Sequence, residues 1–184
     1  MDDVTQVEQL KYERMWDLDD YRTYSPGEKA LSAVISVLKE GTTLGDFGCG
    51  TGRAAQGLQA RGFDVTGIDF AANCLDPEVN IPFEQHCLWE LPSDMLFDVG
   101  YCTDVMEHIP PRKVHATLKC ISGATRLGCF FQIATFKDKF GGKIGEPLHL
   151  SVQPAEVWES VLMKHWPHVK MLRGGRDARF WVSH

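Results

Sequence analysis

Two hydrophobic patterns alternate along the chain. Nearly continuous apolar runs are typical of strands buried on both faces of a sheet, and apolar residues every three or four positions are typical of amphipathic helices. The first pattern predicts strands at residues 42–47, 63–68, 97–103, 128–135, 168–172 and 178–182, with a short further strand within 82–92. The second predicts helices at residues 4–22, 28–39, 52–61, 106–121 and 154–165, with one helical turn at 71–75. Alternating strands and helices predict an α/β fold.

Length and composition are those of an ordinary globular domain. We expect residues 1–184 to form a single domain, because a chain of this length can bury a core of its own. Hydrophobic residues make up 43% and charged residues 24%, which excludes a largely disordered chain. No apolar stretch is long enough to span a bilayer and no signal peptide is recognisable. The sequence therefore predicts a cytoplasmic protein without a membrane partner.

The net charge and the cysteine pattern limit which macromolecules and metals we expect this protein to bind. The net charge of −6 disfavours a nucleic-acid partner, because sequence-independent binding to a polyanion rests on clustered lysines and arginines. The six cysteines include no C-x-x-C pair and have no histidine at zinc-ligand spacing, so no metal site is predicted. We expect the six cysteines to be reduced thiols. Nothing in the sequence indicates an oligomeric state.

A glycine-rich turn follows the first predicted strand. Gly48, Gly50 and Gly52 stand at alternate positions between this strand and a helix, and Cys49 lies among them. Glycines at such a turn let bare backbone N–H groups and a helix N-terminus approach a ligand. Asp46 precedes the turn at the end of the strand, where its carboxylate can accept a hydrogen bond from a cationic amine. The turn is therefore a candidate ligand site.

A second acid lies at the end of a predicted strand, as Asp46 does. Asp69 ends the second predicted strand, 17 residues after Gly52, and an acid there is placed to accept both hydroxyls of a ribose. A nucleoside-type cofactor across the strand ends is thus predicted. A dinucleotide fingerprint would require glycine at position 53, which is Arg53, so a nicotinamide-dependent oxidoreductase is disfavoured.

The segment 44–52 and the segment 97–110, which contains a Glu-His pair, together resemble the class I S-adenosylmethionine-dependent methyltransferases. The resemblance covers nearly the whole chain in order. It implies a three-layer αβα sandwich around a seven-stranded, mostly parallel sheet whose last strand is antiparallel. It also implies S-adenosyl-L-methionine as the cofactor, a lid helix within residues 1–24 and a substrate-facing loop at 136–153.

The resemblance further implies which residues contact the cofactor. Besides the turn and the two acids, Phe70, Cys87, Leu88 and Trp89 would face the adenine, and Thr103 and Asp104 would lie under the methionine part. Two aromatic residues of the lid, Tyr12 and Trp16, would cover the cofactor, and Arg53 would lie beside the cofactor's carboxylate. Relatives often place an aspartate at the end of the third strand, where this chain has Cys87. For the lid aromatics, packing onto the sheet is an equal alternative.

Two histidines are candidates for acid-base chemistry. His108 follows the fourth predicted strand and His149 lies in the irregular loop after the fifth, and histidine is suited to accept a proton near neutral pH. Structural roles remain open for both. The lysines at 137, 139 and 143 either hold an anionic group of the acceptor or are simply solvated.

The leading hypothesis is an enzyme that methylates oxygen or nitrogen of a small cytosolic molecule. A nucleic-acid methyltransferase is less favoured, since residues 102–106 carry neither the Pro-Pro-Tyr-type motif of amino methylation nor a Pro-Cys nucleophile. A module that binds S-adenosylmethionine without catalysis is a third possibility.

Overall fold

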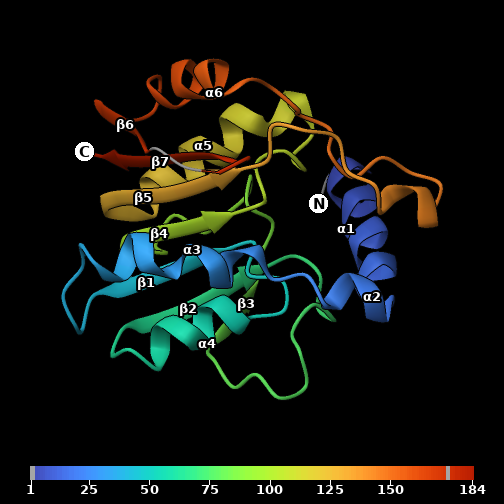
Figure 1. Cartoon of the computed structure of the whole chain (residues 1–184), viewed down its shortest axis with the longest axis horizontal. Helices are drawn as coiled ribbons and strands as arrows, with labels where there is room; N and C mark the ends of the chain where they lie inside the picture. The colour runs from blue at the N-terminus through green and yellow to red at the C-terminus, as the bar shows by residue number, and fades with distance from the viewer. Residues whose placement is uncertain (1–2, 173–174) are drawn as a thin grey trace.

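The computed structural model, which describes residues 3–172 and 175–184, contains one seven-stranded sheet with the order β3-β2-β1-β4-β5-β7-β6 (Figure 1). The strands are β1 (Thr43–Phe47), β2 (Asp64–Asp69), β3 (Phe83–Gln85), β4 (Phe97–Thr103), β5 (Thr125–Ile133), β6 (His168–Leu172) and β7 (Ala178–Ser183). Neighbours are parallel except that β7 is antiparallel to β5 and β6. The predicted mostly parallel sheet with an antiparallel last strand is confirmed.

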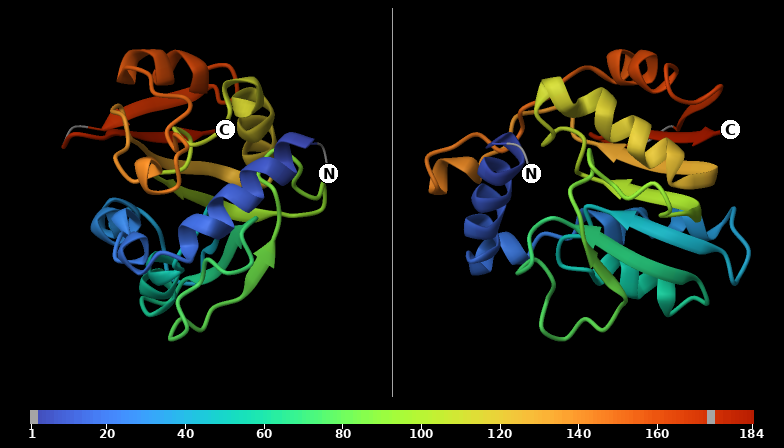
Figure 2. Two further views of the ribbon diagram at one scale, coloured as in Figure 1. Left: turned by 90° about the vertical axis from the view of Figure 1, so that its right-hand side faces the viewer. Right: turned by 180° about the vertical axis from the view of Figure 1, so that it is seen from behind.

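Helices cover both faces of the sheet, which completes the predicted three layers (Figures 1 and 2). The helices are α1 (Asp3–Trp16), α2 (Asp19–Arg22), α3 (Pro26–Ile35), α4 (Arg53–Gln59), α5 (Val114–Gly123) and α6 (Ala155–Leu162), with 3-10 turns at Pro111–Lys113 and Gly141–Lys143. Side chains of α3 and α4 bury one apolar cluster against the sheet, and those of α5 and α6 bury another.

The strands are buried as their sequences predict. Leu44 and Phe47 of β1 are fully buried, and so are Phe130 and Phe131 of β5 on the two faces of the sheet. Burying one such side chain stabilises the fold by about 1.5–3 kcal/mol. The continuous apolar runs therefore specify central strands covered on both sides.

The N-terminal helix differs from its prediction. The helix predicted at residues 4–22 is divided into α1 and α2, because Leu18 has extended backbone angles (φ −93°, ψ 114°). The break lets the Arg22 side chain fold back and donate to the carbonyl oxygen of Trp16 at 2.7 Å. The predicted helical turn at 71–75 is not helical. Instead, the backbone N–H of Cys74 donates to the carbonyl oxygen of Ala71 in a turn, and the carbonyl oxygens of Asn73, Cys74 and Leu75 accept from Arg22.

Two other elements are shorter than the sequence predicts. The helix predicted from residue 106 begins only at Val114, because Pro110 and Pro111 cannot donate the hydrogen bonds of a helix interior. β3 has three residues, and residues 86–92 form a loop. The predicted turn between the last two strands lies partly outside the described residues.

The topology places the site at one edge of the sheet. The carboxyl ends of β1, β2, β4 and β5 meet at a common edge, as parallel strands do. Helices α1 and α2 and the loop after β5 lie across this edge (Figures 1 and 2). Met15 and Trp16 of α1 pack there in one cluster with Cys49, Cys74 and Leu148. Two segments that are far apart in the sequence, the N-terminal helices and the loop after β5, therefore cover this edge.

No helix in the described ranges combines the length and apolar character needed to cross a bilayer.

Candidate functional site

The glycine-rich turn has the backbone that its sequence predicts. Gly48, Gly50 and Gly52 have φ values of 75°, 49° and 73°, in the left-handed region that disfavours other residues. A Cβ atom on Gly50 would lie 2.9 Å from the indole of Trp16, so the turn also permits close approach of the lid. The glycines thus serve both the chain reversal and the contact with α1.

Asp46 lines this site as a buried acid with one unpartnered carboxylate oxygen. It is 2% exposed, and its Oδ2 has no hydrogen-bond partner among the described residues. Burial, together with the nearby charge of Asp69, raises the pKa of Asp46 to about 7. A hydrogen bond from the backbone of Ala55 offsets only part of this rise, and a buried carboxylate oxygen without a partner is costly. The site therefore favours a ligand that brings a cationic group to Asp46.

Asp69 is held by the turn itself. Its Oδ2 accepts from the backbone N–H of Gly50 at 3.1 Å and its Oδ1 from that of Ala71 at 3.0 Å. Burial raises the pKa of Asp69 to about 6, although these two bonds favour the ionised form. Each carboxylate oxygen can accept more than one bond. The fixed carboxylate is thus available to a diol.

An aromatic cavity adjoins Asp69. Phe70, Trp89 and Tyr12 line it, with ring centroids 5.6 Å apart for Tyr12 and Phe70 and 6.3 Å apart for Phe70 and Trp89. The indole N–H of Trp89 donates to Thr5 of the lid at 2.9 Å. Leu88 also lines this cavity, whereas Cys87 does not. The cavity has the flat apolar walls that suit a purine ring.

The floor of the cleft is formed by the end of β4. Asp104 has a φ of 54°, which is uncommon for a residue other than glycine. Its carboxylate accepts from the Gln132 amide at 2.7 Å, and the amide oxygen of Gln132 accepts from Arg179 at 2.8 Å. Burial raises the pKa of Asp104 to about 6. The sequence analysis missed Gln132, whose signal is a lone polar residue within the apolar run of β5.

The two candidate histidines lie together, with ring centroids 4.6 Å apart and ring planes at 82°. Nδ1 of His108 lies 2.6 Å from the hydroxyl of Tyr12, and Nδ1 of His149 lies 2.6 Å from the carbonyl oxygen of Phe136. Burial, and next the charge of His149, lowers the pKa of His108 to about 3. His108 is therefore a neutral imidazole at physiological pH.

Glu107 brings the two histidines together. Its backbone carbonyl accepts from the N–H groups of Leu150 and Ser151, each at 2.8 Å, which ties the loop after β5 to the end of β4. The side chain is fully buried, and burial, followed by the charge of Asp104, raises the pKa of its carboxyl. The sequence analysis gave Glu107 no role, although its place directly before His108 is a signal.

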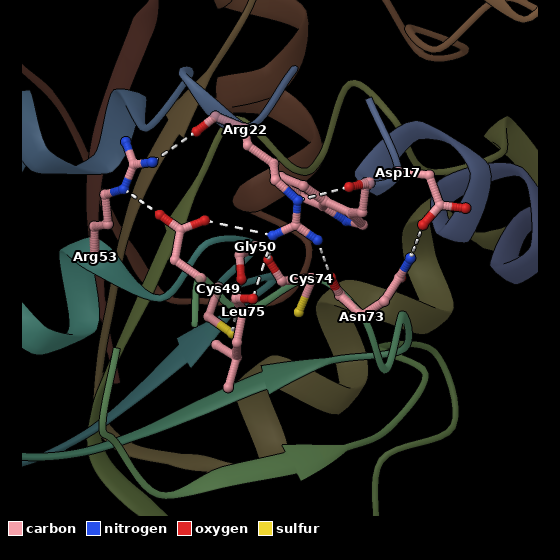
Figure 3. A network of polar contacts seen from close by, with 10 residues as sticks. Asp17, Arg22, Cys49, Gly50, Arg53, Asn73, Cys74 and Leu75 are labelled. Carbon is pink, nitrogen blue, oxygen red and sulfur yellow. Dashed lines mark hydrogen bonds and ion pairs between the residues drawn. The ribbon is translucent and has the colours of Figure 1, made fainter. Parts of the chain in front are cut away.

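The lid is fastened by a polar network that Figure 3 shows from close by. The guanidinium of Arg22 in α2 donates to the carbonyl oxygens of Asn73, Cys74 and Leu75 and pairs with Asp76 at 3.4 Å. Arg53 pairs with the same Asp76 at 2.5 Å. This network joins α2, the loop after β2 and the start of α4.

The structure places Arg53 away from its predicted position. Its guanidinium faces Asp76 and the carbonyl oxygen of Arg22, at 2.9 Å, rather than the cleft. Gly52 and Cys87 are also absent from the residues that line the cleft. For Arg53, the reason is the nearby acid Asp76, which the sequence analysis did not consider.

A second, larger cavity of about 440 Å³ continues from the aromatic one toward the loop after β5. Gly48, Asp104 and His108 line both cavities, so the two form one cleft. The predicted site residues that border the cleft are Tyr12, Trp16, Asp46, Gly48, Cys49, Gly50, Asp69, Phe70, Leu88, Trp89, Thr103, Asp104, His108 and His149.

Cationic side chains surround the wide end of this cleft. Lys29, Lys137, Lys139 and Arg176 line it, and the Arg176 guanidinium lies 3.4 Å from the centroid of the Phe136 ring. Lys143 instead pairs with Asp20 of the lid. The acids Asp138 and Asp177 line it as well, so the wide end carries charges of both signs beside an aromatic surface.

A sheet of this strand order, with a glycine-rich turn after β1 and acids at the ends of β1 and β2, defines the class of Rossmann-like S-adenosylmethionine-dependent methyltransferases. Residues 21–169 match the family model described as "Methyltransferase domain". The chain belongs to this family.

Curated relatives include several ubiquinone biosynthesis O-methyltransferases. The one from Alkalilimnicola ehrlichii is 33% identical over 94 residues, covering 45% of this chain and 38% of the relative. The one from Rickettsia akari is 39% identical over 72 residues, covering 35% and 29%. The chain spans less than two fifths of the length of either relative.

Solved structures share the fold. PH0226 protein from Pyrococcus horikoshii has a TM-score of 0.69 at 14% identity, covering 91% of this chain and 92% of that chain. Magnesium protoporphyrin IX methyltransferase from Synechocystis, solved with bound S-adenosylmethionine, has a TM-score of 0.60 at 17% identity, covering 84% and 77%. At these identities the likeness concerns the fold.

Proposed function

We propose that the protein transfers the methyl group of S-adenosylmethionine to an oxygen atom of a small molecule, with nitrogen as the second candidate. The observation that carries the proposal is the pair of buried acids Asp46 and Asp69 on either side of the glycine-rich turn, with Oδ2 of Asp46 left without a partner among the described residues. The names of the curated relatives favour oxygen as the acceptor atom.

The cofactor would lie along the cleft with its amine beside Asp46, its ribose on Asp69 and its adenine between Phe70 and Trp89. Bound there, S-adenosylmethionine supplies an electrophilic methyl group on a sulfonium. The chain contributes position: Tyr12 and Trp16 cover the cofactor, and Thr103 and Asp104 form the floor. Methyl transfer depends strongly on such alignment of the reacting atoms.

His108 and His149 are proposed to face the acceptor. Both border the wide part of the cleft, and their Nδ1 atoms are already held by neighbours. A neutral imidazole in this position can accept the proton that a hydroxyl or ammonium loses as it is methylated. Because burial lowers the pKa of His108 to about 3, His108 accepts a proton less readily than an ordinary imidazole, and His149 is the better candidate to remove the acceptor's proton.

The acceptor is proposed to be anionic. Lys137, Lys139 and Arg176 bring cationic groups to the wide end of the cleft, where Asp138 and Asp177 also lie, while the chain as a whole has a net charge of −6. A carboxylate or phosphate on the acceptor would meet these side chains. The Phe136 ring beside them suits an aromatic acceptor.

We also propose that residues 1–184 act as one domain, with residues 1–24 as a lid and residues 136–153 as the loop that faces the acceptor. A cytoplasmic location is proposed because the structure has all six cysteines as free thiols, which is typical of a reducing compartment.

The proposal is tested by calorimetry and by methyl transfer. We expect S-adenosylmethionine to bind and NAD not to bind, and S-adenosylhomocysteine to form when the protein is incubated with hydroxylated aromatic acids. Lys137→Ala with Lys139→Ala should raise KM for the anionic acceptor but leave KM for the cofactor unchanged. A folded protein that ignores S-adenosylmethionine at millimolar concentration contradicts the assignment. Binding without any turnover would favour the module without catalysis.

A further inference from the structure

A compact cluster of metal-ligand side chains borders the wide part of the cleft. One ligand atom each of Glu107, His108 and His149 lies within 4.8 Å of the other two. Glu107 and His108 follow β4, and His149 comes from the loop after β5. The backbone bonds from Leu150 and Ser151 to the Glu107 carbonyl hold these two segments together.

Glu107 is an unusual residue to bury here. Its side chain is fully buried, and neither carboxylate oxygen meets a well-aligned hydrogen-bond donor among the described residues, although the backbone N–H groups of Glu107 itself and of Ala134 lie near the carboxylate. A buried carboxylate normally pairs with a cation, accepts hydrogen bonds or coordinates a metal. The nearest ligand atoms, those of two imidazoles, are of the kind that coordinates a metal together with a carboxylate.

The two histidines are oriented as metal ligands are. A ligating histidine usually has its other ring nitrogen held by a carbonyl, a carboxylate or water. Nδ1 of His149 is held by the Phe136 carbonyl and Nδ1 of His108 by the Tyr12 hydroxyl, both at 2.6 Å. These contacts leave Nε2 of each ring for coordination.

We infer that Glu107, His108 and His149 bind a divalent transition-metal ion. Two imidazoles and one carboxylate favour zinc, iron, cobalt or nickel over magnesium or calcium, which prefer oxygen ligands, and three ligands leave coordination positions open. Because His108 and His149 line the cleft, an open position can face the acceptor.

The use of the ion rests on the proposed function. An acceptor hydroxyl that coordinates the ion loses its proton to solvent more readily. Its oxygen then forms a bond to the methyl carbon as the carbon–sulfur bond of the cofactor breaks, with the electron pair going to sulfur. With the ion bound, this acidification takes the place of proton transfer to a free imidazole.

The test is a titration of the metal-free protein with Co²⁺, followed by calorimetry and visible absorbance. We expect one Co²⁺ per chain and an absorption spectrum of nitrogen and oxygen ligands without thiolate bands. Glu107→Gln and His149→Ala should each weaken binding about 10-fold or more. His115→Ala is the matched control, because the exposed His115–His165 pair, with nitrogens 3.0 Å apart, is another place where an ion could bind.

Circular dichroism and S-adenosylmethionine binding, measured on the same samples, report folding and the proposed function separately. Wild-type protein that binds the cofactor but no Co²⁺ overturns the metal site alone. Equal Co²⁺ affinity in the wild type, Glu107→Gln and His149→Ala also overturns it, as does loss of binding in His115→Ala only.

Discussion

The hydroxyl of Tyr12 lies 2.6 Å from Nδ1 of His108, which joins the lid helix α1 to the segment after β4. Ninety-six positions of sequence separate the two residues. The contact places one edge of the lid directly beside the proposed acceptor site, so closure of the lid and orientation of the imidazole depend on each other.

Tyr12→Phe should therefore weaken cofactor binding and misalign His108. Loss of one buried hydrogen bond costs about 1 kcal/mol, which corresponds to about a fivefold rise in the Kd for S-adenosylmethionine. Calorimetry measures the Kd and steady-state kinetics measure kcat. Tyr101→Phe is the control, since the Tyr101 hydroxyl donates to the carbonyl oxygen of Gly27 at 2.6 Å and its side chain does not line the cleft. Identical Kd values in Tyr12→Phe and wild type would show that the contact does not hold the lid.

Cofactor binding should depend on pH through Asp46 and Asp69. Burial raises the pKa of these carboxyls to about 7 and about 6 in the free protein, so both take up protons as the pH falls through this range. A cationic amine needs Asp46 ionised. The affinity for S-adenosylmethionine should thus fall below pH 7, by up to about tenfold per pH unit. Calorimetry between pH 5 and 8 measures it.

Stability of the free protein should follow the opposite trend. An acid whose pKa is raised by folding stabilises the protein fully below its unfolded pKa, and that contribution is lost as the pH rises through the folded value. Asp46→Asn should therefore raise Tm at pH 8 while weakening cofactor binding. A lower Tm for Asp46→Asn than for wild type at pH 8 would contradict the idea that the buried charge of Asp46 destabilises the free protein.

Arg22→Lys should loosen the lid without unfolding the domain. Lysine cannot reproduce the fork of donors that Arg22 directs at three carbonyl oxygens and Asp76. We expect faster hydrogen exchange in residues 3–22 and about a tenfold higher Kd for the cofactor, roughly 1.4 kcal/mol. Arg61→Lys, at an exposed arginine that donates to Gly57, is the control. Unchanged exchange in α1 and α2 would contradict a fastening role.

Gly50→Ala compared with Gly41→Ala separates backbone strain from contact with the lid. Both glycines have positive φ, so alanine at either position should cost about 1–2 kcal/mol of unfolding free energy. A Cβ on Gly50 meets the Trp16 ring at 2.9 Å, whereas one on Gly41 meets nothing within 4 Å. Only Gly50→Ala should weaken cofactor binding, as calorimetry and chemical denaturation can show. Equal Kd values for the two variants would contradict the contact.

The central strands and the part of the site that lies on them follow from the sequence alone. Apolar runs fix β1, β4 and β5, and the glycines fix the sharp turn after β1, because each depends on residues close together in the chain. Parallel strands end at one edge, so Asp46 and Asp69 had to be neighbours once the strands were known. These are local preferences combined with one rule of topology.

The rest of the site could not be predicted without the folded structure. Whether His149 meets His108 depends on the Glu107 carbonyl that anchors a loop more than 40 residues away, and Arg53 turns from the cleft because Asp76 comes within reach. The burial of Glu107 and the Asp104–Gln132–Arg179 chain have the same origin. Contacts between distant segments depend on how loops close and on which buried charges find partners. The periodicity of hydrophobic residues along the chain gives no information on either.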